Sequence, residues 1–349
     1  MTQVTIQELE NLSNAALDFY IKGEPMPQAL QERPLMKALM GVQKTFSGGK
    51  GDIRGNVKGD YTTSFIGYSD SDTVVYQRPA NIKQFVVPWR ELHAGIEITF
   101  TDLKKDGINV VDSIAGERTS DMKGRIEHAI SNLFEDKLDD MSEGSARSFN
   151  EIMWQDGTQS AKVPAGVLSI VTDNPDSGVV EGIDGAQNTW WRNRSFVGSD
   201  KVTASVSNQT LTKKLRIEVR QLRRYGGKPN IILAGSGFIE QLEAEVAEKG
   251  TYTQEGFMKS GSTEIGLADI TMRGVGAVTY DPTLDDLNLE NRAYFLDTRH
   301  IKPYVMEGEN MVRHSPARPA EKYVIYRGIT WTGALVCQKR NAHMVIEVA

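Results

Sequence analysis

The longest hydrophobic pattern in the chain recurs every three or four residues from about Ser120 to about Gln155. This spacing places apolar side chains on one face of an α-helix and charged side chains on the other. Ser120 is a suitable N-cap, and Asp156-Gly157 is a suitable stop. At 1.5 Å per residue the helix would be on the order of 50 Å long, so we expect it to brace an extended body. The apolar positions are Met122, Ile126, Ile130, Leu133, Phe134, Leu138, Met141, Phe149, Ile152 and Met153.

Two segments with different patterns precede this long helix. Residues 1 to 39 begin with helical spacing and are then broken by one glycine and three prolines, which is typical of an arm that lies against another surface. The stretch from Lys44 to Pro88 is rich in glycine and poor in large apolar residues in its first part, and Thr73–Gln77 and Lys83–Val87 are predicted strands. We therefore expect a long hairpin that stands away from the body, an uncommon feature that is normally functional.

The chain after the long helix mixes helices and strands, which predicts an α/β or α+β layer. A basic amphipathic helix is predicted at Gln209–Tyr225, and a second helix, capped by Ser236, at Phe238–Lys249. We expect the strands of the C-terminal part to form one antiparallel sheet beneath the long helix. The helix and this sheet would then form one region, and the chain between them would be an insertion into it. The predicted strands are Ile96 to Phe100 before the helix, then Asn230–Ala234, Leu267–Met272, Gly276–Tyr280, Ala293–Leu296, Ile301–Met306, Tyr323–Tyr326, Ile329–Val336 and Met344–Val348.

The composition narrows the class of protein. The chain has 349 residues, of which 39% are hydrophobic and 25% charged, as in a globular protein. Its net charge of −6 argues against a broad nucleic-acid footprint. Cys337 is the only cysteine, which excludes internal disulfides and thiolate metal cages. No secretion signal and no apolar run of membrane-spanning length are present, so we expect a soluble protein made in a reducing cytoplasm.

The sequence contains no catalytic motif, and we expect neither an enzyme nor a cofactor or metal. The sequence around Ser236 does not match a nucleophile elbow. Asp173 to Asp184 has the length of a calcium loop but places Pro175 and Ser177 at ligand positions. The five histidines lack metal-ligand spacing. A hydrolase or transferase that uses His93 or His128 is the alternative from another class of protein.

Several charged and aromatic residues are candidates for an interface instead. Lys50, Arg54 and Lys58 lie among the glycines of the expected hairpin, and the Trp190-Trp191 pair is typical of an anchor packed into a core or an interface. Six basic residues share the helix 209–225, for which a solvated or subunit-facing role is favoured over phosphate contact. The candidate interface residues are Lys50, Arg54, Lys58, Trp89, Trp190, Trp191 and Arg192, and the basic helix residues are Lys213, Lys214, Arg216, Arg220, Arg223 and Arg224.

Three short motifs, in this order along the chain, resemble those of tailed-phage major capsid proteins of the Hong Kong 97-type fold. They are Trp89-Arg90-Glu91-Leu92-His93-Ala94-Gly95, the helix exit Met153-Trp154-Gln155-Asp156-Gly157-Thr158 leading to Ala165-Gly166-Val167, and Glu181-Gly182-Ile183-Asp184 followed by Asn188-Thr189-Trp190-Trp191-Arg192-Asn193. The order of the expected parts matches the order in that family over nearly the whole chain. The sequence around the loop lysines does not match that of capsid proteins whose subunits are covalently cross-linked. The resemblance therefore does not imply a cross-link in this protein.

The resemblance implies an α+β capsid fold in four parts. These are an N-terminal arm at 1–43, an extended β-hairpin loop at 44–88, a peripheral domain at 89–157 and 293–349 with the spine helix at 120–155 over an antiparallel sheet, and an inserted α/β axial domain at 158–292. It implies pentamers and hexamers of this chain in an icosahedral shell, assembled in the host cytoplasm and enclosing dsDNA that is contacted non-specifically, with no membrane. Scaffolding, portal and decoration proteins stay open as partners. An encapsulin-like compartment around protein cargo is the alternative within the same fold.

Overall fold

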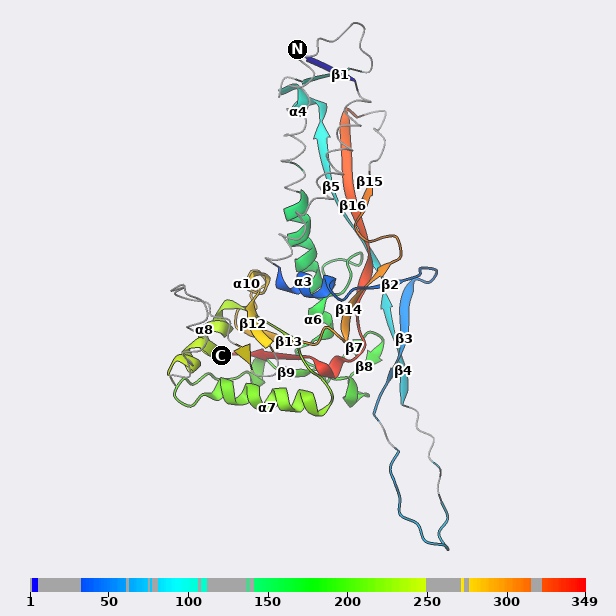
Figure 1. Cartoon of the computed structure of the whole chain (residues 1–349), viewed down its shortest axis with the longest axis vertical. Coiled ribbons are helices and arrows are strands. Elements are labelled where there is room, and N and C mark those ends of the chain that lie inside the picture. Colours follow the sequence, from blue (N-terminus) through cyan, green and yellow to red (C-terminus); the bar gives the residue numbers. More distant parts are fainter. Residues whose placement is uncertain are drawn as a thin grey trace.

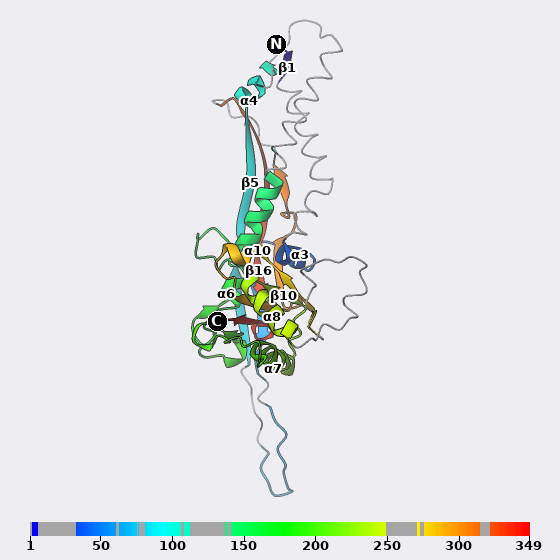
Figure 2. The same ribbon diagram turned by 90° about the vertical axis from the view of Figure 1, so that its left-hand side faces the viewer.

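The computed structural model describes residues 2–5, 33–60, 63–74, 76, 81–105, 108–111, 137, 141–248, 271–272, 276–314 and 322–349. The described elements form a narrow, elongated body with a sheet of long strands at one end and a mixed sheet at the other (Figures 1 and 2). A helix at 141–154 runs alongside the long strands and ends where the two sheets meet. We call it the spine helix.

The first sheet is built on a single long strand, β16 (Val324–Cys337). This strand pairs antiparallel with β5 (Arg90–Thr99) over ten residue pairs, from Val324 opposite Thr99 to Gly333 opposite Arg90. The other strands are β14 (Ile301–Met306), β15 (Val312–His314) and β2 (Lys44–Phe46), the last of which pairs parallel with β14. Beyond β5 the chain continues into α4 (Phe100–Lys105) and then β6 (Ile108–Val111), which pairs parallel with β1 (Thr2–Thr5).

The second sheet has six strands in the order β11, β12, β10, β13, β17, β9. Amphipathic helices cover one face, where α7 and α8 bury Leu215, Leu222 and Phe238 against the sheet. The opposite face packs against α3, α6, α10 and the spine helix. The strands are β9 (Arg194–Phe196), β10 (Ile231–Ala234), β11 (Thr271–Met272), β12 (Gly276–Tyr280), β13 (Arg292–Leu296) and β17 (Met344–Glu347); the helices are α3 (Pro34–Met40), α6 (Val167–Ile170), α7 (Thr210–Arg224), α8 (Ser236–Glu248) and α10 (Pro282–Asp286).

Buried polar contacts fix the end of the spine helix against the second sheet. The Trp154 indole is fully buried, donates a hydrogen bond to Asp281 Oδ2 at 2.9 Å and meets Tyr294 edge to face. Asn150 donates to Thr283 Oγ1 at 2.7 Å and accepts from the Met36 backbone NH at 3.2 Å. Because each of these buried groups has a partner, the junction between the helix and both sheets has a specific geometry.

The hairpin of β3 (Asp52–Lys58) and β4 (Ile82–Pro88) is the third structural unit. Its strands pair antiparallel from Asp52 opposite Pro88 to Lys58 opposite Ile82, and the connecting segment projects away from both sheets (Figure 1). Smaller elements lie at its base: the two-stranded ribbon of β7 (Val179–Val180) and β8 (Ile183–Asp184), and the 3-10 turns η1 (Thr189–Trp191), η2 (Gly198–Asp200) and η3 (Arg340–Ala342).

The structure corrects two expectations about secondary structure, and a third lies largely outside the described residues. The tail strands do not share one sheet: β14 and β16 lie in the first, whereas β13 and β17 pair with each other in the second, beside β10 and β9. A buried strand fits either sheet by its apolar pattern, and long-range pairing decides between them. The strand that pairs with β4 is 52–58 and not the expected strand 73–77. The described residues of that expected strand, 73, 74 and 76, are not in a strand. Of the expected helix 120–155, residues 120–136 and 138–140 lie outside the described residues.

The expected cap of the helix after β10 is also wrong. Ser236 is the first residue of α8 rather than the residue before it. The Asp285 side chain accepts the hydrogen bond from the Ser236 backbone NH at 3.0 Å. A residue distant in sequence thus gives a partner to a backbone NH that has none within the first turn of α8.

Candidate interaction surface

The far part of the β3–β4 hairpin exposes large apolar side chains. We call residues 63–76 the hairpin tip. Of the eleven large apolar side chains that are exposed in the described part of the chain, five lie on the tip and one at the start of β4. Phe65 and Tyr76 are 109% and 92% exposed, so neither makes appreciable contact with its own chain. The six side chains are Phe65, Ile66, Tyr68, Val74, Tyr76 and Ile82. A patch of this kind on a projecting element marks a surface for a partner.

The other end of the hairpin is packed firmly against the body. Ile53, Val57, Phe85 and Val87 bury their side chains against Trp191 and against residues of β8 and β16. We call this cluster the hairpin root. It forms because alternate residues of β3 and β4 point to the same face of a two-stranded ribbon, and that face is apolar. The hairpin is therefore held at its base while its tip is left without cover from its own chain.

The candidate aromatic residues all lie at the root, where they attach the hairpin to the body; their role at an interface stays a prediction. Trp191 is 1% exposed, and its Nε1 donates to the Val180 carbonyl at 3.3 Å. Trp190 is half-buried, meets Trp191 edge to face, and lies so close to Gly59 that a Cβ there would come within 2.7 Å of its ring. Trp89 Nε1 donates to the Lys50 carbonyl at 2.8 Å, which closes the loop before β3.

The candidate charged residues lie apart from one another. Arg54 pairs with Asp52 at 3.1 Å on the same strand. Lys50 precedes β3, and Lys58 ends it and lines a cleft. Arg192 donates to the Gly185 carbonyl at 2.8 Å and pairs with Asp176 at 2.8 Å, so it holds the loop between β8 and η1. The structure does not bring these residues together into one site, and their role at an interface stays a prediction.

A glutamate with an enclosed carboxyl joins the hairpin to both neighbouring elements. The Glu181 carbonyl accepts the Val86 NH of β4 at 2.9 Å, and its side-chain Oε1 accepts the Cys337 NH of β16 at 2.6 Å. The other oxygen, Oε2, is enclosed without a hydrogen-bond partner. Burial raises the pKa of Glu181 to about 8, although the Cys337 NH and the Arg340 charge oppose this shift. Sequence reasoning missed this role, because Glu181 carried no signal beyond its place in a motif.

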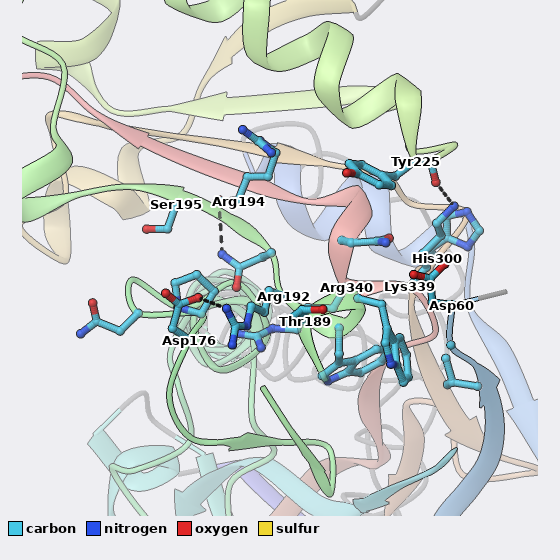
Figure 3. Close-up of a pocket in the computed structure, with 18 of the residues that line it drawn as sticks. Asp60, Asp176, Thr189, Arg192, Arg194, Ser195, Tyr225, His300, Lys339 and Arg340 are labelled. Atoms are coloured by element: carbon cyan, nitrogen blue, oxygen red, sulfur yellow. Dashed lines mark hydrogen bonds and ion pairs between the residues drawn. The ribbon is translucent and has the colours of Figure 1, made fainter. Parts of the chain in front are cut away.

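A polar cleft of about 1140 Å³ lies between the hairpin root and the second sheet (Figure 3). Charged side chains of both signs line the cleft, and several of them form ion pairs. Arg192 pairs with Asp176, and Arg194 Nε donates a hydrogen bond to Glu218 at 2.7 Å. Arg340 is fully buried at its floor and donates to the Ile170 carbonyl at 2.6 Å. Burial lowers the pKa of Arg340 to about 10. The cleft is thus lined by groups that hold loops together.

The geometry does not support the hydrolase alternative. Ser195 Oγ in the cleft has no hydrogen-bond partner among the described residues, so His300 does not activate it. The His93 ring lies instead over Gly95 and Gly328 on the outer surface of the first sheet, where a Cβ on Gly328 would come within 2.6 Å of it. His128 lies outside the described residues.

The described residues provide neither a metal-binding cluster nor a helix that could span a membrane. No group of three or more histidine, cysteine, aspartate or glutamate side chains there could hold a metal ion. Asp173 to Asp184, the segment of calcium-loop length, contains the β7–β8 ribbon, and Asp173 pairs with Arg292 at 3.1 Å. No described helix is long and apolar enough to cross a membrane.

The comparisons with known proteins place the fold. No protein-family profile matches the sequence, and no curated protein matches it. Among solved structures, the chain is similar to a capsid chain of cyanophage A-1(L), with 12% identity and a TM-score of 0.62 over 90% of this chain and 92% of that one. It is also similar to the capsid of a native GTA particle (13% identity, TM-score 0.52, 89% and 90%) and to the capsid of cyanophage P-SCSP1u (10%, 0.50, 88% and 86%). The chain therefore has the mixed α and β fold of these capsid proteins, as the sequence motifs predicted.

Proposed function

We propose that this chain is the major capsid protein of a tailed phage and that it assembles into a closed icosahedral shell around the genome. The observation that carries the proposal is the correspondence of fold with capsid chains over about nine tenths of both chains. The hairpin tip supports it independently, because a projecting element with exposed Phe65 and Tyr76 is suited to lie across a neighbouring copy. We see no arrangement of described side chains that favours an enzyme.

The tip supplies a physical basis for association. Fully burying one large apolar side chain stabilises a contact by about 1.5–3 kcal/mol. The five such side chains of the tip, with Ile82 at the start of β4, are enough to offset part of the loss of translational and rotational freedom, which is about 4–15 kcal/mol for each association. A tip on one copy and a receiving surface elsewhere on the next copy make a head-to-tail contact, and repeated contacts of this type close into rings and shells.

The assignment of parts follows the capsid fold. In this proposal residues 1–43 are the arm, 44–88 the extended loop, 89–157 and 293–349 the peripheral domain, and 158–292 the inserted axial domain. Strands β13 and β17 are the exception. They pair with β10 and β9, which supports placing β13 and β17 in the sheet of the axial domain. Assembly in the host cytoplasm, pentamers and hexamers, and non-specific contact with packaged dsDNA belong to the same proposal, as do scaffolding, portal or decoration proteins as further partners.

The test is assembly of the purified full-length protein, followed by sedimentation and electron microscopy. We expect closed shells tens of nanometres across, or rings of five and six copies where a scaffold is required. The matched variant carries Phe65→Ser and Tyr76→Ser on the tip, and its control carries Tyr323→Ser, another exposed aromatic side chain outside the hairpin. We expect the tip variant to stay unassembled and the control to form particles.

Two outcomes would contradict the proposal. A wild-type protein that stays monomeric at high concentration would overturn shell formation. Particles from infected cells that hold protein cargo and no nucleic acid would assign the chain to an encapsulin-like compartment instead.

A further inference from the structure

The outer face of α7 is basic and is not covered by its own chain. Its inner face buries Leu211, Leu215 and Leu222 in the second sheet, which leaves the opposite face in solvent. No described carboxylate forms an ion pair with the four basic residues that lie on this exposed face. The four residues are Lys213, Arg216, Arg220 and Arg224. We call them, together with the exposed apolar residues Ile217 and Tyr225, the α7 face.

Exposed apolar side chains accompany these charges. Ile217 is 46% exposed and Tyr225 is 55% exposed, within and directly after the same helix. Arginine, tyrosine and an aliphatic side chain on one face form the composition of a protein–protein interface, in which charges surround apolar anchors.

An acidic surface that also contains an exposed aromatic side chain lies beside α10, at the ends of strands β10 and β12. Asp285, Asp286 and Glu290 cluster on α10 and the turn that follows it, around Tyr280, which is 41% exposed. We call these four residues the acidic corner. The Tyr280 hydroxyl donates to Asp285 Oδ2 at 2.8 Å. This hydrogen bond, burial, and the charges of Asp285 and Asp286 raise the pKa of Tyr280 to about 12.

Asp286 and Glu290 keep their charge available for a partner. Both are exposed, and neither forms an ion pair with a described residue. The acidic corner and the α7 face are separate surfaces of one chain: the acidic corner lies on α10 and at the start of α8, whereas α7 runs along the face of the sheet that α8 also covers. The same relation is visible in Figure 1, where α7 lies along the lower edge and α10 above the sheet.

We propose that the α7 face of one copy binds the acidic corner of a second copy of this chain. The two surfaces are complementary in charge, each contains exposed apolar side chains, and they are different surfaces of one chain, as a head-to-tail contact requires. The hairpin projects on the side of the molecule where α7 lies (Figure 1), so one neighbour can meet both the α7 face and the hairpin. This inference rests on the proposed shell-forming function and assigns to it a specific pair of surfaces.

A charge-swap experiment tests the contact. One variant carries Arg216→Glu and Arg220→Glu, a second carries Asp286→Arg and Glu290→Arg, and a third carries all four changes. Like charges across the contact in either of the first two should raise the concentration needed for assembly at least about tenfold, equivalent to ~1.4 kcal/mol. The third variant restores opposite charges, so it should assemble near the wild-type concentration.

The controls separate this contact from a general effect of net charge and from misfolding. A variant with Lys162→Glu and Lys201→Glu has the same change in net charge as the α7 variant, at exposed positions outside the α7 face, and should assemble normally. Unchanged denaturation midpoints of the unassembled variants would show that folding is intact; Arg216→Gln with Arg220→Gln replaces any variant that does not fold.

Two results would overturn the inference. The first is normal assembly of the α7 variant; if its particles formed in host cells then held less nucleic acid than wild-type particles, the α7 face would be assigned to phosphate contact. The second is a four-change variant that stays as impaired as the two-change variants. Wild-type protein that never assembles would instead contradict the proposed function, so the two failures are distinguishable.

Discussion

The two ends of the β3–β4 hairpin differ in what covers their apolar side chains. At the root, Phe85 and Val87 are buried against Trp191, which the same chain supplies. At the tip, Phe65 and Tyr76 are exposed and lack such cover. Apolar residues on a single hairpin therefore serve two purposes: one set fixes the hairpin to its own subunit, and the other is available to a neighbour. Mutations at the two ends should consequently separate folding from assembly.

The largest effect on folding is expected at Trp191 in the root. Trp191→Ala removes a fully buried aromatic side chain and leaves a cavity, so it should lower the free energy of unfolding by about 3–5 kcal/mol. Urea denaturation of the unassembled subunit measures this change. Trp190→Ala is the matched control, since that ring is only half-buried and should cost less. Equal and small effects of the two changes would show that the root does not anchor the hairpin.

An intermediate effect is expected from the ionisation of Glu181. Its pKa is about 8 in the folded protein, against an ordinary value of 4.5, so the protonated carboxyl favours the folded state. This contribution is complete below pH 4.5 and is lost as the pH rises to 8 and above. The groups that face the carboxyl are the Cys337 NH and thiol, Arg340 and Tyr304. Of these, only the NH and the Arg340 charge favour ionisation.

The Glu181→Gln variant isolates this pH dependence. Gln retains an oxygen that can accept the Cys337 NH, and it does not ionise. We expect the wild type to lose about 2 kcal/mol relative to this variant between about pH 5 and pH 9, less than the full linkage value because the residue as a whole is only half-buried and can turn toward water. Glu91→Gln, at an exposed position on β5, is the control and should follow the wild type. Parallel stability curves for wild type and Glu181→Gln would contradict the enclosed carboxyl.

The smallest effect on folding is expected at the tip. Phe65→Ser with Tyr76→Ser should change the free energy of unfolding by no more than about 0.5 kcal/mol, because neither ring has appreciable contact with its own chain. Thermal denaturation of the unassembled subunit checks this. A large destabilisation would mean that the tip packs on its own subunit, and the contrast between root and tip would fail.

Much of the local structure could be predicted from the sequence. The alternation of apolar residues indicated β5, the helical spacing indicated α7, and the expected strand 301–306 coincides with β14. These elements are recognisable because a strand or helix with one buried face must repeat at its own period. The expected strand 83–87 lies within β4, but its partner β3 was missed because its glycine and alternate polar residues weaken the apolar pattern.

The sequence by itself determined the period of each element, the absence of a disulfide within the given chain, and the motifs that indicated a capsid fold. Only the tertiary structure decided which sheet receives each tail strand, which end of the hairpin is covered, and where single polar groups act. Glu181, Asp281 and Arg340 show why: each has a hydrogen-bond partner more than a hundred positions away, in Cys337, Trp154 and Ile170 respectively. Periodicity reports only whether a face is buried, while the partner that satisfies a buried charge or hydrogen bond is set by chain segments that meet after folding.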